Sequence, residues 1–343
     1  MKAIIIMTGV FLGIALGLYP GINKPKPTWW KLFAMALMTV LILISFIPPI
    51  AANFTTAKYL ANAYDDYTGN LLVTVTDNPK YSKQEKLWIV TVEQNQLHEL
   101  LVYSGNTLPA EFKKGNKLVV KFKYDKNNDY FIYQSTVSVN PLLTFPVVPG
   151  LEEQIRIMNF HVPVAWISVV AYFFAMFFAI KYLGTRDLDY DFKASAAAEI
   201  GILFTILATI TGMIWAKMNW GSFWNWDPRE TAIFLLLLIY GAYFALRAAI
   251  ENEELRAKLS AVYSIIAFLT VPFLIFVLPR ILEGLHPGSD NDSTTGPILS
   301  PQQDTLNYLQ QIAFSMGFAA FSLLFFWLLN IRYRLKKIEY KIL

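Results

Sequence analysis

The sequence of 343 residues has no cysteine and only three histidines, His98, His161 and His286. A chain without cysteine forms no disulfide, thiolate metal site or thiol redox centre. Any chemistry that requires an imidazole therefore has three candidates. Charged residues are also scarce, at 16%, against about a quarter in average globular proteins. Because 55% of the residues are hydrophobic, the composition favours a membrane protein over a soluble one.

Several common signatures of enzymes are absent as well. The sequence contains no Walker or dinucleotide-binding glycine pattern, no nucleophile elbow and no HExxH. ATP hydrolysis, nicotinamide chemistry and zinc proteolysis thus find no support, and a bond-making enzyme is not indicated. The formal net charge is only +4, and we expect lipid rather than nucleic acid around this chain.

Seven apolar runs approach the length of about twenty residues that a helix needs to cross the hydrocarbon core. They cover residues 3–19, 31–51, 160–183, 196–215, 231–249, 259–281 and 308–331. No small-residue cleavage pattern follows the first run, so we interpret it as a retained helix rather than a signal peptide. The predicted fold is an all-α polytopic membrane bundle of about seven transmembrane helices. Two of these fall in residues 1–52 and five in residues 158–343.

Basic residues in the short loops predict the orientation, because such residues are retained on the cytoplasmic side. They occur in the first loop, around the loops after the third and fifth runs, and in the C-terminal tail: Lys24, Lys26, Lys31, Lys181, Arg186, Lys193, Arg247, Arg256, Lys258, Arg332, Arg334, Lys336, Lys337 and Lys341. If the helices alternate, these four segments share the cytoplasmic side. The N-terminus and residues 220–229 and 283–304 are then expected on the outer face.

Residues 53–157 have the composition of a soluble insert. The runs LLVTVT, WIVTV, ELLVY, KLVVKFKY and YFIYQSTVSV are separated by Gly, Asn, Asp and Pro, which is typical of strands joined by turns. We predict a small all-β extracytoplasmic domain of about five strands. Its length exempts it from the basic-loop rule.

The segment NWGSFWNWDPRET, residues 219–231, holds three of the nine tryptophans. If it is helical, Trp220, Phe223, Trp224 and Asp227 share one face. A tryptophan belt at the membrane interface explains one or two such residues without any function. Three tryptophans beside Asp227 and Arg229 instead suggest an aromatic surface for a large planar ligand that carries carboxylates.

Two histidines are expected on the same outer face as this loop. His161 begins the third apolar run and His286 follows the sixth. Each alone is more simply explained as an interfacial histidine, but together they could bind an iron from opposite sides of a porphyrin. Arg156, Arg229 and Arg280 could pair with its propionates, although anchoring of lipid headgroups explains Arg156 and Arg280 equally well. His98 belongs to the insert, and we interpret it as a surface or strand residue.

The stretches RIMNFHVPVAW, WGSFWNWDPRE and LLLLIYGAYFALRAAIENEE to LEGLHPGS resemble the haem-handling proteins of cytochrome c maturation. The resemblance is to the CcmC branch of the CcmC/CcmF/CcsA tryptophan-rich (WWD) superfamily, although DPRET is closer to the CcsA branch. It covers about residues 154–331 and the second span. It implies non-covalently bound haem b in transit, with His161 and His286 as axial iron ligands. It also implies a haem-holding loop that contains Trp220, Trp224, Trp226 and Asp227, beside which we place Phe223.

Within the insert, ELLVYSGNTLPAEFKKGNKLVVKFKY, residues 99–124, resembles the OB-fold haem chaperone CcmE around its YxGxLPxxFxxG stretch. The resemblance implies an OB-like fold. After the last strand, where that chaperone bonds haem through a histidine, this chain reads STVSVNPLL. We interpret the insert as a docking or gating module, with a structural remnant as the alternative.

The leading hypothesis is therefore a haem-delivery protein of the bacterial inner membrane, with a CcmE-type chaperone and ABC-type exporter subunits as partners. A CcsA-like cytochrome c synthetase is the alternative, and it predicts further histidines inside the membrane, where the fourth, fifth and seventh runs have none. A general small-molecule transporter is the second alternative. That class should show ionisable or helix-breaking groups at mid-membrane.

Overall fold

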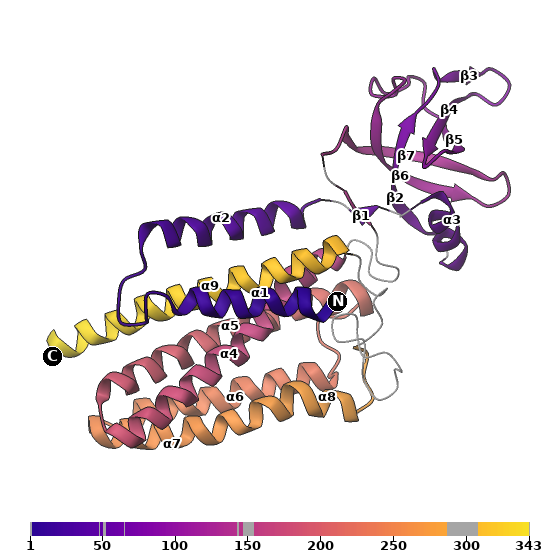
Figure 1. The fold of residues 1–343 in the computed structure, drawn as a ribbon. Helices are drawn as coiled ribbons and strands as arrows, with labels where there is room; N and C mark the ends of the chain where they lie inside the picture. Colours follow the sequence, from indigo (N-terminus) through magenta and orange to yellow (C-terminus); the bar gives the residue numbers. More distant parts are fainter. Residues whose placement is uncertain are drawn as a thin grey trace. The chain divides into compact units, whose positions relative to one another are not determined.

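The computed structural model describes residues 2–47, 49–50, 53–64, 66–142, 144–146, 154–286 and 308–342. The chain forms two compact units, Met1–Ile44 with Arg156–Leu343, and Ser45–Ile155 (Figure 1). Most of the predicted outer segment 283–304 lies outside the described residues. Each unit is described by itself below.

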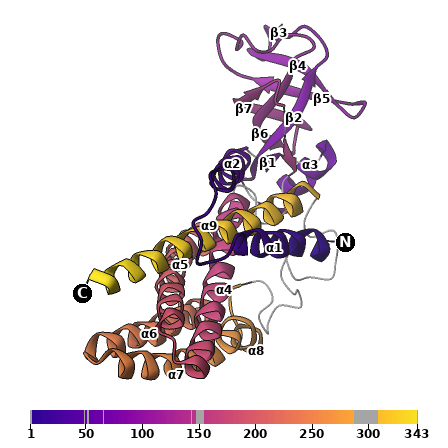
Figure 2. The same cartoon turned by 60° about the vertical axis from the view of Figure 1, so that its left-hand side comes forward.

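The first unit is a bundle of helices (Figures 1 and 2). They are α1 (Lys2–Leu18), α2 (Thr28–Ser45), α4 (Ile155–Thr185), α5 (Leu188–Trp220), α6 (Pro228–Ala249), α7 (Glu253–Pro272) and α9 (Tyr308–Ile342). A single π-helical turn, η2 (Phe273–Val277), and the short α8 (Leu278–Ile281) extend α7. Among the described residues, six helices are long and apolar enough to cross a membrane.

The count of seven spans is not confirmed. The first apolar run does form a helix, but α1 has 17 residues, fewer than the roughly twenty that cover the hydrocarbon core. The second run also ends earlier than predicted, at Ser45 rather than residue 51, because prolines follow at positions 48 and 49 and proline cannot donate the next helical hydrogen bond. The described part of the unit is a multi-pass helical bundle with six helices of spanning length.

Helix α1 packs along α9 through three glycines one turn apart, Gly9, Gly13 and Gly17. A Cβ atom on Gly13 would lie 2.7 Å from the Ser322 Cβ, and one on Gly9 or Gly17 would overlap Ser315 or Phe326. Without a hydrophobic driving force between helices in lipid, small residues permit the close backbone approach that makes association favourable. The glycines therefore fix α1 to α9.

Replacing Gly13 by Leu is expected to separate α1 from α9 and to destabilise the first unit by about 1–3 kcal/mol, the usual cost of overpacking. Thermal unfolding of the detergent-purified protein measures this effect. The matched control is Gly241→Leu in α6, where a Cβ atom meets nothing within 4 Å and Leu is the better helix former. Equal melting temperatures for the two variants would contradict this packing role.

The second unit is a β-barrel-like domain. The five predicted runs form β2 (Thr68–Val75), β4 (Leu87–Gln94), β5 (Leu97–Tyr103), β6 (Lys117–Asp125) and β7 (Tyr130–Val139). The sheet order is β2-β6-β7-β5-β4-β3, and an additional pairing of β2 with β4 closes it. Strands β5 and β7 are parallel, and the other neighbours in this sheet are antiparallel. The sequence did not predict the short β1 (Pro49–Ile50), β3 (Lys80–Ser82) and β8 (Phe145–Pro146), nor α3 (Phe54–Ala63).

The YxGxLPxxFxxG stretch of this unit has a packing role. Phe112 is buried, and its ring meets that of Tyr133 edge-on at 5.0 Å. Tyr103 meets Tyr133 in the same way at 5.3 Å, and Gly115 takes a φ of +89°, which glycine adopts most readily. The stretch therefore folds over the barrel core between β5 and β6.

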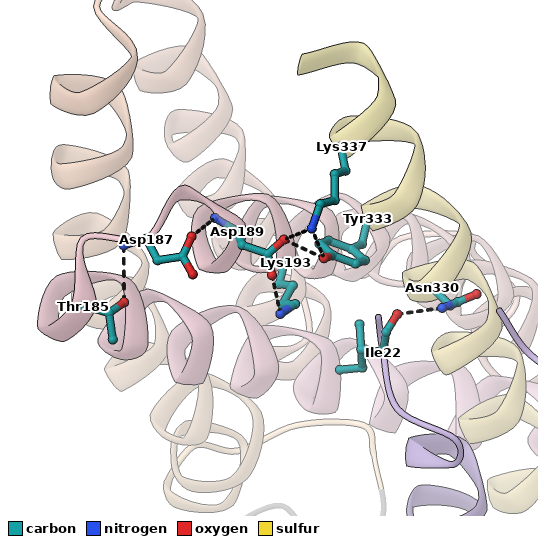
Figure 3. A network of polar contacts seen from close by, with 8 residues as sticks. All are labelled: Ile22, Thr185, Asp187, Asp189, Lys193, Asn330, Tyr333 and Lys337. Carbon is teal, nitrogen blue, oxygen red and sulfur yellow. Dashed lines mark hydrogen bonds and ion pairs between the residues drawn. The ribbon is translucent and has the colours of Figure 1, made fainter. Parts of the chain in front are cut away.

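At one end of the helical unit, charged side chains of α5 and α9 form a network (Figure 3). The Asp189 carboxylate accepts hydrogen bonds from the Tyr333 hydroxyl at 2.6 Å and from Lys337 at 2.9 Å. It also pairs with Lys193 at 2.6 Å. Glu199, for which the sequence suggested no role, pairs with Arg332 and Lys336 of α9.

Further contacts bring the remaining basic segments to the same end. The Asn330 amide donates to the carbonyl oxygens of Ile22 and Lys24, in the loop after α1, at 2.6 and 2.8 Å. Arg247, near the end of α6, donates to both oxygens of Asp191 in the first turn of α5 at 2.7 and 2.9 Å. The first loop, the α4–α5 and α6–α7 connections and the C-terminal tail are therefore neighbours.

Candidate functional site

The tryptophan-rich segment is a loop rather than a helix. Helix α5 ends at Trp220 because Gly221 takes the left-handed conformation, with a φ of +79°. Helix α6 begins at Pro228, and Asp227 is its N-cap. The proposed single helical face for Trp220, Phe223, Trp224 and Asp227 is therefore not present.

The aromatic rings of the loop also do not form one flat surface. Trp224 and Trp226 meet at 5.7 Å with their planes at 90°, and Trp224 contacts Phe234 of α6 edge-on. Trp226 is 69% exposed and has a φ of +55°, which is uncommon for a non-glycine residue. Phe223 is also exposed. The loop thus presents two large exposed rings, supported by a third.

Asp227 joins the loop to the segment after α8. Its carboxylate accepts hydrogen bonds from the backbone N–H of Arg229 at 2.9 Å and from that of Leu285 at 2.6 Å. It is also 2.7 Å from Nδ1 of His286. Glu230 completes a capping box on α6, so the carboxylate stabilises this helix start and holds residues 285 and 286 against it.

The protonation state of this pair follows from its surroundings. The buried Asp227 carboxylate faces three N–H groups, those of the Arg229 and Leu285 backbone and of the His286 ring, and these contacts outweigh burial and lower its pKa. An ionised carboxylate can only accept, so Nδ1 of His286 carries the hydrogen. The other ring nitrogen, Nε2, is then the one with a lone pair suited to a metal. The Trp220 ring lies edge-on to the imidazole at 4.6 Å.

His161 is held in a parallel way inside α4. Its Nδ1 is 2.9 Å from the Thr211 hydroxyl of α5. Two backbone carbonyl oxygens of α5 are acceptors for the single hydrogen of that hydroxyl, Leu207 at 2.8 Å and Ala208 at 3.2 Å. With its hydrogen on either carbonyl, the Thr211 oxygen accepts from the Nδ1–H of His161, and Nε2 is then the nitrogen suited to a metal.

His286 and Arg229 are within electrostatic range of His161, and Arg280 is within similar range of Arg229. Arg156 precedes His161 by five residues of α4, which places it about 140° around the helix from that histidine. His98 lies in the other unit, exposed on β5.

Thr211 and the Leu285 N–H are contacts that the sequence did not indicate. Thr211 is one of several threonines in an apolar helix, and nothing in the neighbouring sequence indicates that it contacts a histidine. Its partner His161 is 50 residues earlier, and only the packing of α4 on α5 brings the two together.

Comparisons with known proteins identify the family of this chain. Residues 136–341 match the CcmC family, described as heme exporter protein C. The heme exporter protein C of Paracoccus denitrificans is 30% identical over 170 residues, which are 50% of this chain and 70% of that protein. The protein of the same name from Rhodobacter capsulatus is 32% identical over 42% of this chain and 60% of that protein. The cytochrome c biogenesis protein CcsA of Cuscuta reflexa is 29% identical over 35% of this chain and 38% of that protein.

The matched range contains all five residues 220, 223, 224, 226 and 227 of the loop and both histidines of the helical unit. It leaves out α1, α2 and most of the β-barrel-like domain. Since the match takes in more than half of the chain, this protein belongs to the CcmC family, in the heme exporter protein C branch of the cytochrome c maturation superfamily.

Proposed function

We propose that this protein binds haem b non-covalently as its cargo and passes it on during cytochrome c maturation. The observation that carries the proposal is the pair His161 and His286, each with Nδ1 engaged by an oxygen. Iron in bis-imidazole haem accepts one nitrogen from each of two rings. A hydrogen bond at the distal ring nitrogen is how metal-binding histidines are usually oriented.

The residues around the pair suit such a cargo. The exposed rings of Phe223 and Trp226, together with Trp224, which contacts Trp226, and Trp220, which contacts His286, offer apolar contact to the porphyrin edge. Asp227 holds the loop in place. Arg229 and Arg280 are the proposed partners of the haem propionates. Arg156 keeps this role only as a prediction, since it lies on another side of α4.

The proposed location is the bacterial inner membrane, with the haem loop and the β-barrel-like domain in the periplasm and the C-terminus in the cytoplasm. The shared end of the four basic segments supports this orientation. The proposed partners are a CcmE-type haem chaperone as acceptor and ABC-type exporter subunits. The names of the relatives, heme exporter protein C, support a transport system.

For the β-barrel-like domain we propose an OB-like fold. Numbered by order in the chain, its five long strands pair as first–second–third–fifth–fourth–first, with the third and fifth parallel. That pairing is compatible with a five-stranded Greek-key barrel. Its role as a docking or gating module stays a prediction.

A second candidate is a CcsA-like cytochrome c synthetase that joins haem to apocytochrome c. The match to the Cuscuta reflexa protein CcsA favours it. The synthetase hypothesis predicts further histidine ligands of haem within the membrane. Helices α5, α6 and α9 contain no histidine, which counts against this hypothesis. Covalent haem–cytochrome product formed by the purified protein would favour the synthetase.

The experiment that tests haem binding is purification of the full chain in detergent from cells that co-produce the chaperone. We expect a bound haem with a six-coordinate, low-spin bis-imidazole spectrum that is extracted intact by acidic acetone, as non-covalent haem is. Protein that is folded, as judged by gel filtration and thermal unfolding, and still free of haem would contradict the proposal. Haem that stays with the polypeptide after extraction would contradict its non-covalent binding.

A further inference from the structure

The two imidazoles have different oxygen partners. His286 donates to Asp227, a carboxylate with 0% side-chain exposure that also receives two backbone N–H groups. Nδ1 of His161 lies 2.9 Å from the neutral hydroxyl of Thr211, whose own hydrogen has the Leu207 and Ala208 carbonyl oxygens as acceptors. A hydrogen bond to an ionised acceptor is roughly twice as strong as one between neutral groups.

This difference reaches the metal through the ring. An acceptor at Nδ1 raises the basicity of Nε2, and an anionic acceptor raises it more. The nitrogen of His286 is therefore the stronger donor to iron, and that of His161 is the weaker. Position adds to this contrast, because His286 is fixed through Asp227 to the start of α6 and packs on the Trp220 ring.

We propose that the site holds haem by two unequal ligands. His161 is the weaker ligand and the first to release iron, and Thr211 is the positioning residue that orients its ring. The inference rests on the proposed function. On release, the bond between iron and Nε2 of His161 breaks, the electron pair stays on the nitrogen, and the iron keeps its oxidation state. The vacated position is then open to a nitrogen or oxygen donor of the acceptor protein.

The first test measures how fast an axial ligand leaves. Carbon monoxide binds reduced bis-imidazole haem only after one imidazole has dissociated, so its binding rate in the full, haem-loaded chain reports the weaker ligand. Thr211→Val removes the acceptor of His161 with little change of shape, and we expect it to accelerate this rate about tenfold, the lower end of the effect of such partners. Thr211→Ser keeps the hydroxyl, and its rate of carbon monoxide binding is expected to be near the wild-type value.

The matched control is Thr209→Val, two residues away on α5. Among the described residues, the hydroxyl of Thr209 bonds only along its own helix, to the Thr205 carbonyl oxygen at 2.8 Å. This variant loses the same atoms from the same helix, and its rate is expected to equal the wild-type rate. A rate that rises equally in Thr209→Val and Thr211→Val would overturn the positioning role.

The second test measures the midpoint potential of the bound haem. Asp227→Asn removes the charge yet keeps a good N-cap for α6, and we expect it to weaken ferric haem binding about tenfold more than ferrous binding. A tenfold difference is about 59 mV for a one-electron couple, so the potential should rise by about that amount and by clearly less in Thr211→Val. Equal shifts in the two variants would overturn the inequality of the ligands.

The outcomes separate this inference from the function it rests on. If wild-type protein binds no haem, the proposed function fails. If wild-type protein binds bis-imidazole haem while Thr211→Val leaves both rate and potential unchanged, only the inference fails. Should Thr211→Val not fold, Thr211→Ala also removes the hydroxyl and takes its place in both measurements.

Discussion

The His161→Ala/His286→Ala double variant is expected to contain no more haem than a mock purification. Both rings offer Nε2 from one region of the helical unit, and without them the described part of that unit has no third imidazole, because His98 is in the other unit. Exposed aromatic rings alone give contact with the porphyrin but no bond to iron. Visible spectra and pyridine haemochrome quantification of the purified proteins measure this loss.

The single variants sharpen the expectation. Each should keep some haem through the remaining histidine and show a five-coordinate or mixed spectrum instead of the bis-imidazole one. If the ligands are unequal, His286→Ala should retain less haem than His161→Ala. His98→Ala changes an exposed imidazole on β5 and is expected to match wild type in haem content and spectrum.

Haem at the wild-type level in a folded double variant would contradict the assignment of His161 and His286 as iron ligands. It would favour the hypothesis of a general small-molecule transporter. Folding is checked by thermal unfolding, since His161 is partly buried between α4 and α5. A variant that has lost haem but keeps the wild-type melting temperature would show that the histidines act as iron ligands and that the loss of haem does not come from unfolding.

Much of the architecture follows from patterns within single segments. Apolar runs of spanning length predicted the helices because length and hydropathy are local properties. Alternating runs predicted the five long strands for the same reason. The helix boundaries at Gly221 and Asp227 are equally local in origin, as a left-handed C-cap and a capping box. The expectation of one helical face missed them because it applied helical spacing across both boundaries.

Contacts between distant segments could not be predicted in this way. The bond from His161 to Thr211 spans 50 residues and that from His286 to Asp227 spans 59, and no periodicity links such positions. The spacing of the glycines in α1 also does not predict which helix packs against them, since α9 lies about 300 residues later. The sequence indicated the ligands, whereas their supporting groups required the fold.

The second large effect is expected at the opposite end of the bundle, where Arg247 and Asp191 form a two-pronged ion pair. Their side chains are only 14% and 4% exposed. Removing one partner leaves the other charge buried without compensation, which costs about 3–5 kcal/mol. In a unit of this size each kcal/mol shifts the melting temperature by about 2–4 °C, so Asp191→Leu should melt roughly 10 °C below wild type.

The double variant Asp191→Leu/Arg247→Met decides what the pair does. Replacing both charges by apolar side chains of similar size removes the desolvation cost together with the attraction, and such replacements are often neutral or stabilising. We expect the double variant to recover most of the melting temperature lost in Asp191→Leu. A further loss in the double variant would contradict this and show that the pair is a net source of stability. Recovery would mean that Asp191→Leu lowers the melting temperature because it leaves the charge of Arg247 buried without a partner. The ion pair would then serve chiefly to align the start of α5 with the end of α6, beside the other basic segments.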